Sequence, residues 1–161
     1  MRIAAIGLGS NVGDRLGALR RALSILKGKD AEILKKSDVF ETPPVGLTEQ
    51  PKFLNACVLI KTSMDPQLLL AQLKEIEAAI GRQDRGHWGP REIDLDILYI
   101  DDLVIRDGEL EIPHPRMHER AFVLVPLSQI SPQWRHPILG KTVEELTGEV
   151  SSSGIIRITT L

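Results

Sequence analysis

The chain has 161 residues, of which 42% are hydrophobic, and this is enough apolar material for one domain with a single substantial core. Its net charge of −2 gives no general attraction to nucleic acid or to an anionic membrane, and no apolar run approaches membrane-spanning length. A single cysteine excludes an internal disulfide framework and favours a reducing compartment, so we expect a cytoplasmic protein.

Apolar periodicity, caps and turn residues predict the elements of the first hundred residues. The expected strands lie at residues 2–8, 33–42, 53–62 and 93–100. The expected helices lie at about 14–28 and 65–81. Asp65 and Pro66 supply an N-cap carboxylate and a first-turn proline, and Gly81 is the expected C-cap. The glycine-rich stretch 7–13 lacks the third glycine of a dinucleotide-binding turn, so we expect a tight turn with Ser10 or Asn11 near the helix cap.

The order strand, helix, strand, strand, helix, strand is the split βαβ or ferredoxin-like pattern. It predicts an α+β fold, a ferredoxin-like βαββαβ sandwich with helices on one face of a mostly antiparallel sheet. After residue 100 we expect a small hairpin around Asp107-Gly108 and short helices near 127–130 and 142–146. We therefore expect residues 1–161 to form one catalytic domain, with a tail after about residue 148 that the pattern does not place.

The stretch from Trp88 to Ile100 carries the most chemical information. Ile93, Leu95, Ile97 and Tyr99 alternate along the expected strand, which places Asp94 and Asp96 together on the opposite face, roughly 7 Å apart along the backbone. Two carboxylates about 5 Å apart repel by roughly 3 kcal/mol at an effective dielectric of 20, which favours a cation between them. Oxygen ligands at this spacing suit Mg²⁺, as one ion or a pair. The alternative is a strand end whose aspartates are solvated or paired with arginine.

Basic residues concentrate around these two aspartates. They are Arg82, Arg85, His87, Arg91, His114, Arg116, His118 and Arg120. Guanidinium groups match phosphate oxygens, and carboxylates for Mg²⁺ beside arginines for phosphate are what phosphoryl transfer needs. Zinc bound by His114 and His118 is a weaker alternative, because no third soft ligand lies nearby and Cys57 is on another strand.

Aromatic residues flank the same region and offer flat surfaces for a heterocycle. They are Phe53, Trp88 and Phe122. Taken singly, each aromatic residue is more often part of a core than a binding platform. Lys74 and Glu77 lie off the buried stripe of the second expected helix, where a solvated face is the simplest interpretation.

Six short stretches follow one another along the chain. They are Thr42-Pro43-Pro44-Val45-Gly46, Gln50-Pro51 through Phe53-Leu54-Asn55, Gly81-Arg82, Trp88-Gly89-Pro90-Arg91-Glu92-Ile93-Asp94-Leu95-Asp96, Pro113-His114 and Arg120-Ala121-Phe122. Together they resemble the 6-hydroxymethyl-7,8-dihydropterin pyrophosphokinase family of folate biosynthesis, from Gly9-Ser10-Asn11 to about Pro126. The resemblance implies a Mg²⁺-dependent diphosphotransferase that moves the terminal pyrophosphoryl group of ATP onto the pterin hydroxymethyl oxygen and releases AMP.

The resemblance also implies a role for individual residues. Asp94 and Asp96 would hold two Mg²⁺ ions, and with the phosphate-binding Arg82 and Arg91 they are the expected catalytic residues. The implied ATP contacts are Lys74, Glu77, Arg82, Arg85, Trp88, Arg91, Ile97, His114 and Arg120. The implied pterin contacts are Thr42, Pro43, Val45, Gly46, Phe53, Asn55, Trp88, Asp94 and Phe122. The expected partners are these small molecules alone, with no nucleic acid or membrane, and the expected state is a monomer.

Two functions from other classes use the same residues. A ferredoxin-like nucleic-acid-binding module would use the basic loops, but its aromatic strand signature is missing and aromatic residues make up only 4% of the chain. A metal-dependent nuclease would use the aspartate pair, and adenine specificity in nucleotide binding separates it from the transferase.

Overall fold

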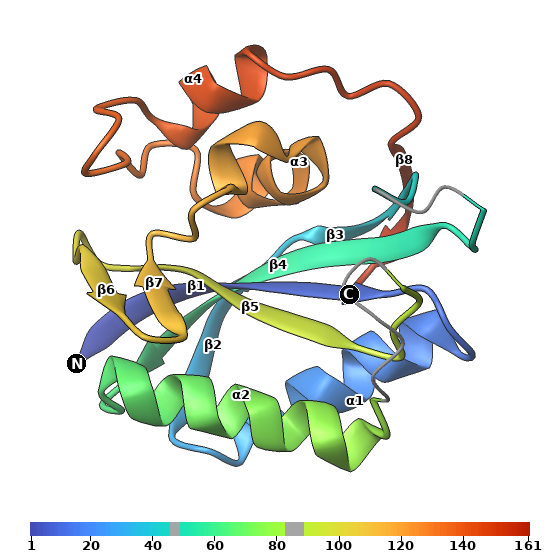
Figure 1. Cartoon of the computed structure of the whole chain (residues 1–161), viewed down its shortest axis with the longest axis horizontal. Coiled ribbons are helices and arrows are strands. Elements are labelled where there is room, and N and C mark those ends of the chain that lie inside the picture. The colour runs from blue at the N-terminus through green and yellow to red at the C-terminus, as the bar shows by residue number, and fades with distance from the viewer. Residues whose placement is uncertain (46–48, 83–88) are drawn as a thin grey trace.

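A computed structural model describes residues 1–45, 49–82 and 89–161, and within these ranges a six-stranded sheet lies between two layers of helices (Figure 1). The strands of this sheet are β1 (Arg2–Ser10), β2 (Ala31–Lys36), β3 (Asp38–Thr42), β4 (Phe53–Thr62), β5 (Asp94–Ile100) and β8 (Ile156–Thr160). The helices are α1 (Arg15–Lys27), α2 (Pro66–Ile80), α3 (Ala121–Ile130) and α4 (Val143–Gly148), with the 3₁₀ helix η1 (Met117–Glu119). A separate hairpin pairs β6 (Ile105–Asp107) with β7 (Leu110–Ile112).

The strand order is β5-β1-β4-β3-β8, with β2 also pairing with β4, and every pair in the sheet is antiparallel. This confirms the α+β, mostly antiparallel fold predicted from the sequence. The predicted strand 33–42 is two strands, β2 and β3, which both pair with β4. Ser37 lies at the break between them, where its hydroxyl accepts a hydrogen bond of 2.8 Å from the backbone N–H of Cys57.

Each face of the sheet has its own hydrophobic core, since β4 is apolar on both sides. Leu54, Val58 and Ile60 face the layer of α1 and α2, whereas Cys57 and Leu59 face the layer of α3 and α4. Figure 1 shows α1 and α2 below the sheet and α3 and α4 above it. The prediction of helices on one face is therefore incomplete, because α3 and α4 cover part of the second face.

A β-bulge alters the predicted alternation of β5. Ala5 pairs with Tyr99 and Ile6 with Ile97, so Leu98 is an extra residue on β5. One extra residue reverses the face of the sheet to which each later residue of the strand points. Tyr99 therefore packs with Leu98 on the α3 side, whereas the alternation predicted that it shares a face with Ile97. The bulge leaves Asp94 and Asp96 unaffected, since both precede it.

The helix ends follow the sequence signals. Asp65 accepts a hydrogen bond of 2.9 Å from the backbone N–H of Leu68 at the start of α2, and Gly81 ends that helix with φ +96°. Asp14, and not Ser10 or Asn11, caps α1 by accepting from the N–H of Gly17, because β1 continues through Ser10. Across the described ranges, no helix has both the length and the apolar character needed to cross a membrane.

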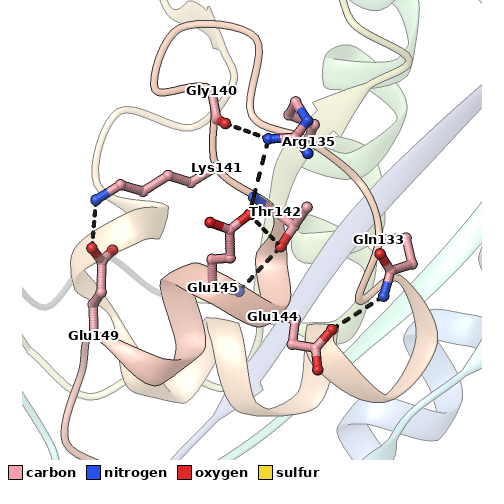
Figure 2. A network of polar contacts seen from close by, with 8 residues as sticks. All are labelled: Gln133, Arg135, Gly140, Lys141, Thr142, Glu144, Glu145 and Glu149. Atoms are coloured by element: carbon pink, nitrogen blue, oxygen red, sulfur yellow. Dashed lines mark hydrogen bonds and ion pairs between the residues drawn. The ribbon is translucent and has the colours of Figure 1, made fainter.

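The last third of the chain forms more regular structure than predicted. The helix expected at 127–130 begins at Ala121, and the tail forms β8, which pairs with β3. At α4, Thr142 and Glu145 form a capping box, with the Thr142 hydroxyl accepting from the N–H of Glu145 at 3.1 Å (Figure 2). Lys141 also pairs with Glu149 at the other end of this helix, so α4 is held at both ends.

Candidate active site

A cavity of about 240 Å³ opens where β1 ends and β4 and β5 begin, on the face of the sheet that α3 covers only in part. The residues that line it are Gly9, Thr42, Pro43, Val45, Phe53, Asn55, Gly89, Arg91, Asp94, Asp96, His114, Arg120 and Phe122. All of them except Gly9 and Gly89 are site residues predicted from the sequence. The fold therefore brings most of the predicted residues to one place from five separate segments.

Asp94 lies between two arginines on the charged side of this cavity. Its Oδ1 is 3.2 Å from Nη1 of Arg82, and its Oδ2 is 3.3 Å from Nη1 of Arg91. Nη1 of Arg82 also lies 2.6 Å from Oε2 of Glu77. For Asp94 the structure thus contains the arginine pairing that the sequence left as an alternative to metal binding, but with a cavity beside the pair.

Asp96 is in a different environment, although its carboxylate shares a face with that of Asp94. Within residues 1–45, 49–82 and 89–161, no basic side chain forms an ion pair with it. Burial, and then the negative charge of Asp94, raise the pKa of Asp96 to about 7. The surroundings of Asp96 thus disfavour its anionic form despite the arginines beside Asp94, and the two acids offer hard oxygen donors, which suits a divalent cation.

The described part of the chain contains no group of three His, Cys, Asp or Glu side chains that could hold a metal by themselves. A cation at Asp94 and Asp96 would thus take its other ligands from phosphate and water, as Mg²⁺ commonly does. Zinc at His114 and His118 gains no support from residues 1–45, 49–82 and 89–161, which contain no group of three such ligands, and Cys57 is buried in the core under α3.

Glu77 is buried rather than solvated, contrary to the simplest interpretation of its position on α2. Its Oε2 accepts hydrogen bonds from the backbone N–H of Leu95 at 2.8 Å and from Arg82. Burial raises the pKa of this carboxyl above its usual range. Glu77 thus joins the end of α2 to the start of β5 and fixes Arg82 beside Asp94.

Four of the described residues predicted to contact ATP do not line the cavity, and one of them is Arg82, which pairs with the lining residue Asp94. Glu77 lies behind Arg82, and Ile97 is buried in the core on the α1–α2 side. Lys74 is on the exposed face of α2, where it pairs with Glu109. Contacts of Lys74, Glu77, Arg82 and Ile97 with a nucleotide remain predictions.

His114 and Arg120 line the same cavity as the carboxylates. The backbone N–H of His114 donates to the carbonyl of Leu98 at 2.8 Å, which attaches the loop before η1 to β5. Burial, and then the charge of Arg120, lower the pKa of His114 to about 4, so the imidazole is neutral at pH 7. The guanidinium carbon of Arg120 lies 5.5 Å from the ring centroid of Phe122, so this arginine borders the aromatic part of the cavity.

Among the described residues, uncharged side chains line the other half of the cavity. Nδ2 of Asn55 donates to Oγ1 of Thr42 at 2.7 Å, which fixes the amide in a cavity that the rings of Phe53 and Phe122 also line. Such a surface suits a flat heterocycle with a polar edge: the rings supply stacking faces, and the amide supplies hydrogen bonds.

Gly9 is a site residue that the sequence analysis missed, because it was assigned to a turn. It lies within β1 opposite Asn55 and Asp94, and a Cβ atom at this position would be only 2.7 Å from Oδ1 of Asn55. Any side chain there would displace the Asn55 amide. A glycine at the end of an apolar strand was the available signal.

Asn11 was also missed, since the sequence placed it near a helix cap. Its Oδ1 accepts from the backbone N–H of Arg91 at 2.7 Å, and its Nδ2 donates to Gln50 at 2.9 Å and to the carbonyl of Pro51 at 3.0 Å. One side chain thus connects the two segments that flank the cavity mouth. The predicted contacts Gly46, Arg85 and Trp88 lie outside the described residues.

Comparison with known proteins assigns the chain to a family. Residues 5–132 match the family described as 7,8-dihydro-6-hydroxymethylpterin-pyrophosphokinase (HPPK). The 2-amino-4-hydroxy-6-hydroxymethyldihydropteridine pyrophosphokinase of Aquifex aeolicus is 44% identical over 149 residues, which are 92% of each chain. The Methylorubrum extorquens protein of the same name is 42% identical over 159 residues, 98% of this chain and 99% of its own.

Solved structures support the same fold. A crystal structure of wild-type Plasmodium falciparum HPPK-DHPS superimposes with a TM-score of 0.74 at 17% identity. The match covers 92% of this chain but only 44% of that longer one. From the matched residues and the relatives of similar length, the chain belongs to the 7,8-dihydro-6-hydroxymethylpterin-pyrophosphokinase family.

Proposed function

We propose that this chain transfers the terminal pyrophosphoryl group of ATP to the hydroxymethyl group of 6-hydroxymethyl-7,8-dihydropterin and releases AMP, a step of folate biosynthesis. Membership of the family supports the reaction. The observation that carries it is the division of one cavity into a half lined by carboxylates and arginines and a half lined by aromatic rings and an amide. These two chemistries suit a metal-bound triphosphate and a pterin, respectively.

The pterin would bind in the neutral half. Phe53 and Phe122 would stack on its two faces, and the Asn55 amide, oriented by Thr42, would form hydrogen bonds with its polar edge. The backbone from Pro43 to Val45 closes this half from the side. In this position the hydroxymethyl group points toward Asp94 and Asp96, where the phosphates would lie.

The triphosphate would bind in the charged half. Asp94 and Asp96 would hold Mg²⁺, and the ions would neutralise phosphate charge and align the leaving group. Arg82 and Arg91 would transfer hydrogen bonds from Asp94 to phosphate oxygens, which accept bidentate guanidinium contacts well. His114, neutral at pH 7, and Arg120 also line the cavity and would contact the nucleotide.

The cavity residues serve mainly to position the two substrates and to stabilise charge. The pterin hydroxyl oxygen attacks the β-phosphorus, and the bond from that phosphorus to the oxygen bridging the α-phosphate breaks. AMP leaves with the bridging oxygen, and the hydroxyl proton passes to water. No general base from the chain is needed in this scheme.

Product analysis tests the proposal. The protein is mixed with ATP, Mg²⁺ and 6-hydroxymethyl-7,8-dihydropterin, and phosphorus NMR should show AMP and a pterin diphosphate in equal amounts. Omitting the pterin or adding a chelator should abolish both signals. ADP as product would indicate ordinary kinase chemistry, and AMP without pterin would indicate a hydrolase, so either result contradicts the proposal.

The oligomeric state and the cellular location of the protein remain predictions. A monomer is expected in solution, and light scattering coupled to size-exclusion chromatography measures it directly. A cytoplasmic location is expected from the single cysteine, Cys57, which is buried and whose thiol pKa is raised by burial.

A further inference from the structure

We infer that the C-terminal segment, residues 151–161, positions the pterin loop, Thr42–Val45, and that Gly154 is the residue through which it acts. This inference rests on the proposed function, because it concerns the half of the cavity assigned to the pterin. The segment lies outside residues 5–132, which match the family, yet it packs against residues that line the cavity. The fold gives it two separate contacts with the pterin loop and the strand that leads to it.

The first contact is the pairing of β8 with β3. Phe40 pairs with Arg157 and Glu41 with Ile156, directly before Thr42. An ion pair of 3.0 Å between Arg157 and Asp38 adds to the backbone ladder. Since β3 has β4 on its other side, β8 covers the outer edge of the strand that leads into the pterin loop.

The second contact is a close approach of Gly154 to Pro43. The backbone at Gly154 has φ +80°, and a Cβ atom there would lie 3.0 Å from Cγ and 3.6 Å from Cδ of Pro43. Glycine is therefore favoured for two reasons, conformation and space. The two can be separated by comparison with Gly140, which has φ +71° but no neighbouring atom within 4 Å in the part of the chain that the structure describes.

The segment acts on the site through Pro43 and not by touching a substrate. Ser151, Ser153 and Ile155 line a second cavity of about 250 Å³, together with Pro43, Pro44 and Val45. Among the described residues, none from this segment lines the main cavity, whereas Pro43 and Val45 line both. The pterin loop is thus a wall between the two cavities, and the C-terminal segment lies on the far side of that wall. Gly154 is accordingly a positioning residue.

A pair of matched glycine variants tests the inference. Gly154→Ala and Gly140→Ala both place a side chain at positive φ, but only Gly154→Ala pushes against Pro43. Equilibrium affinities for the pterin and for a non-hydrolysable ATP analogue with Mg²⁺ are measured, each at saturation with the other ligand. Gly154→Ala should weaken pterin binding roughly three- to tenfold, because small displacements of positioning groups are costly, and leave nucleotide binding within about twofold. Gly140→Ala should leave both affinities within about twofold.

Two further variants keep the test decisive. Gly154→Asn still places a Cβ atom against Pro43, but asparagine tolerates positive φ, so it serves if Gly154→Ala fails to fold. The double variant Gly154→Ala/Pro43→Ala should bind the pterin as tightly as Pro43→Ala alone, because the Cγ and Cδ atoms that oppose the new Cβ atom are gone.

The inference is overturned if folded Gly154→Ala or Gly154→Asn binds the pterin as the unmodified chain does, or if pterin and nucleotide affinities fall equally. Failure of the proposed function gives a different result, since the unmodified chain would then bind no pterin. The two failures are therefore distinguishable in one set of titrations.

Discussion

The two halves of the cavity differ in how their side chains are held. In the charged half, Arg82 forms ion pairs with Glu77 and with Asp94, and Arg91 forms a second ion pair with Asp94. In the neutral half, a hydrogen bond from Asn55 to Thr42 orients the amide, and the rings of Phe53 and Phe122 line the cavity. Phosphate binding in the charged half thus requires Arg82 and Arg91 to exchange Asp94 for phosphate oxygens. The neutral half is already arranged for a flat ligand.

The largest effect is expected from Asp96, which forms no ion pair with an arginine among the residues that the structure describes. Metal-assisted charge stabilisation is worth several kcal/mol, and each 1.36 kcal/mol is a factor of ten in rate, so Asp96→Asn should lower kcat by roughly a thousandfold. The fold should survive, because the substitution removes an electrostatically unfavourable buried charge. Steady-state kinetics and a thermal melt measure the two quantities.

Asp102→Asn is the matched control for Asp96→Asn, since Asp102 is exposed in the turn after β5. It should leave kcat within about twofold, as expected of surface substitutions. Normal turnover in Asp96→Asn would show that the carboxylate pair holds no catalytic cation and would remove the distinction between the halves.

Truncating an aromatic ring of the neutral half should affect pterin affinity and little else. Stacking on an aromatic ring is worth about 1–3 kcal/mol, so Phe53→Ala should weaken pterin binding by roughly five- to 150-fold. Nucleotide affinity should stay within about twofold in this variant. Phe122→Ala should give a similar loss for the pterin and a small additional loss for ATP, because the ring of Phe122 also contacts Arg120. A larger loss for ATP than for the pterin in either variant would contradict the division of the cavity.

A smaller effect is expected from the hydrogen bond that orients Asn55. Thr42→Val removes the acceptor of this bond at nearly constant shape, and a net hydrogen bond is worth about 0.5–1.5 kcal/mol, so pterin affinity should fall roughly two- to tenfold. Thr62→Val is the matched control, since the Thr62 hydroxyl is buried and accepts from Met64 at the far end of β4. If both variants bind the pterin equally well, Asn55 does not depend on Thr42.

The smallest effect concerns His114, the uncharged member of the charged half. Its pKa of about 4 in the folded protein is below the ordinary 6.5, so the unfolded chain binds a proton between these values that the folded chain does not. The contribution of this group to stability is thus complete above pH 6.5 and decreases as the pH falls toward 4. NMR of the imidazole carbons should show a neutral ring from pH 8 down to about 5, and a midpoint near 6.5 would contradict the buried environment.

The sequence predicted the fold class and most of the cavity because the signals were local. Asp94 and Asp96 follow from alternation along one strand, and the helix caps at Asp65 and Gly81 follow from neighbouring residues. The concentration of basic and aromatic residues made His114, Arg120 and Phe122 candidates, and the family resemblance assigned each of them a role.

The features that the sequence did not predict depend on pairing between distant segments. The bulge at Leu98 is set by the register of β5 on β1, and the role of Gly9 is apparent only once Asn55 lies opposite it. Asn11 joins segments about 40 and 80 residues away in the chain, and β8 pairs with a strand formed from residues near position 40. Glu77 was assigned to a solvated face because helical periodicity does not reveal the strand edge that it contacts.

The most direct test of the divided cavity is a pair of calorimetric titrations on the variants Asp96→Asn and Phe53→Ala. Each variant is titrated with a non-hydrolysable ATP analogue plus Mg²⁺ and with the pterin, each at saturation with the other ligand. Asp96→Asn should weaken nucleotide binding by roughly tenfold or more, and only when Mg²⁺ is present, while Phe53→Ala should weaken only the pterin. If both variants weaken the same ligand, or if the loss in Asp96→Asn is equal without Mg²⁺, the account is contradicted.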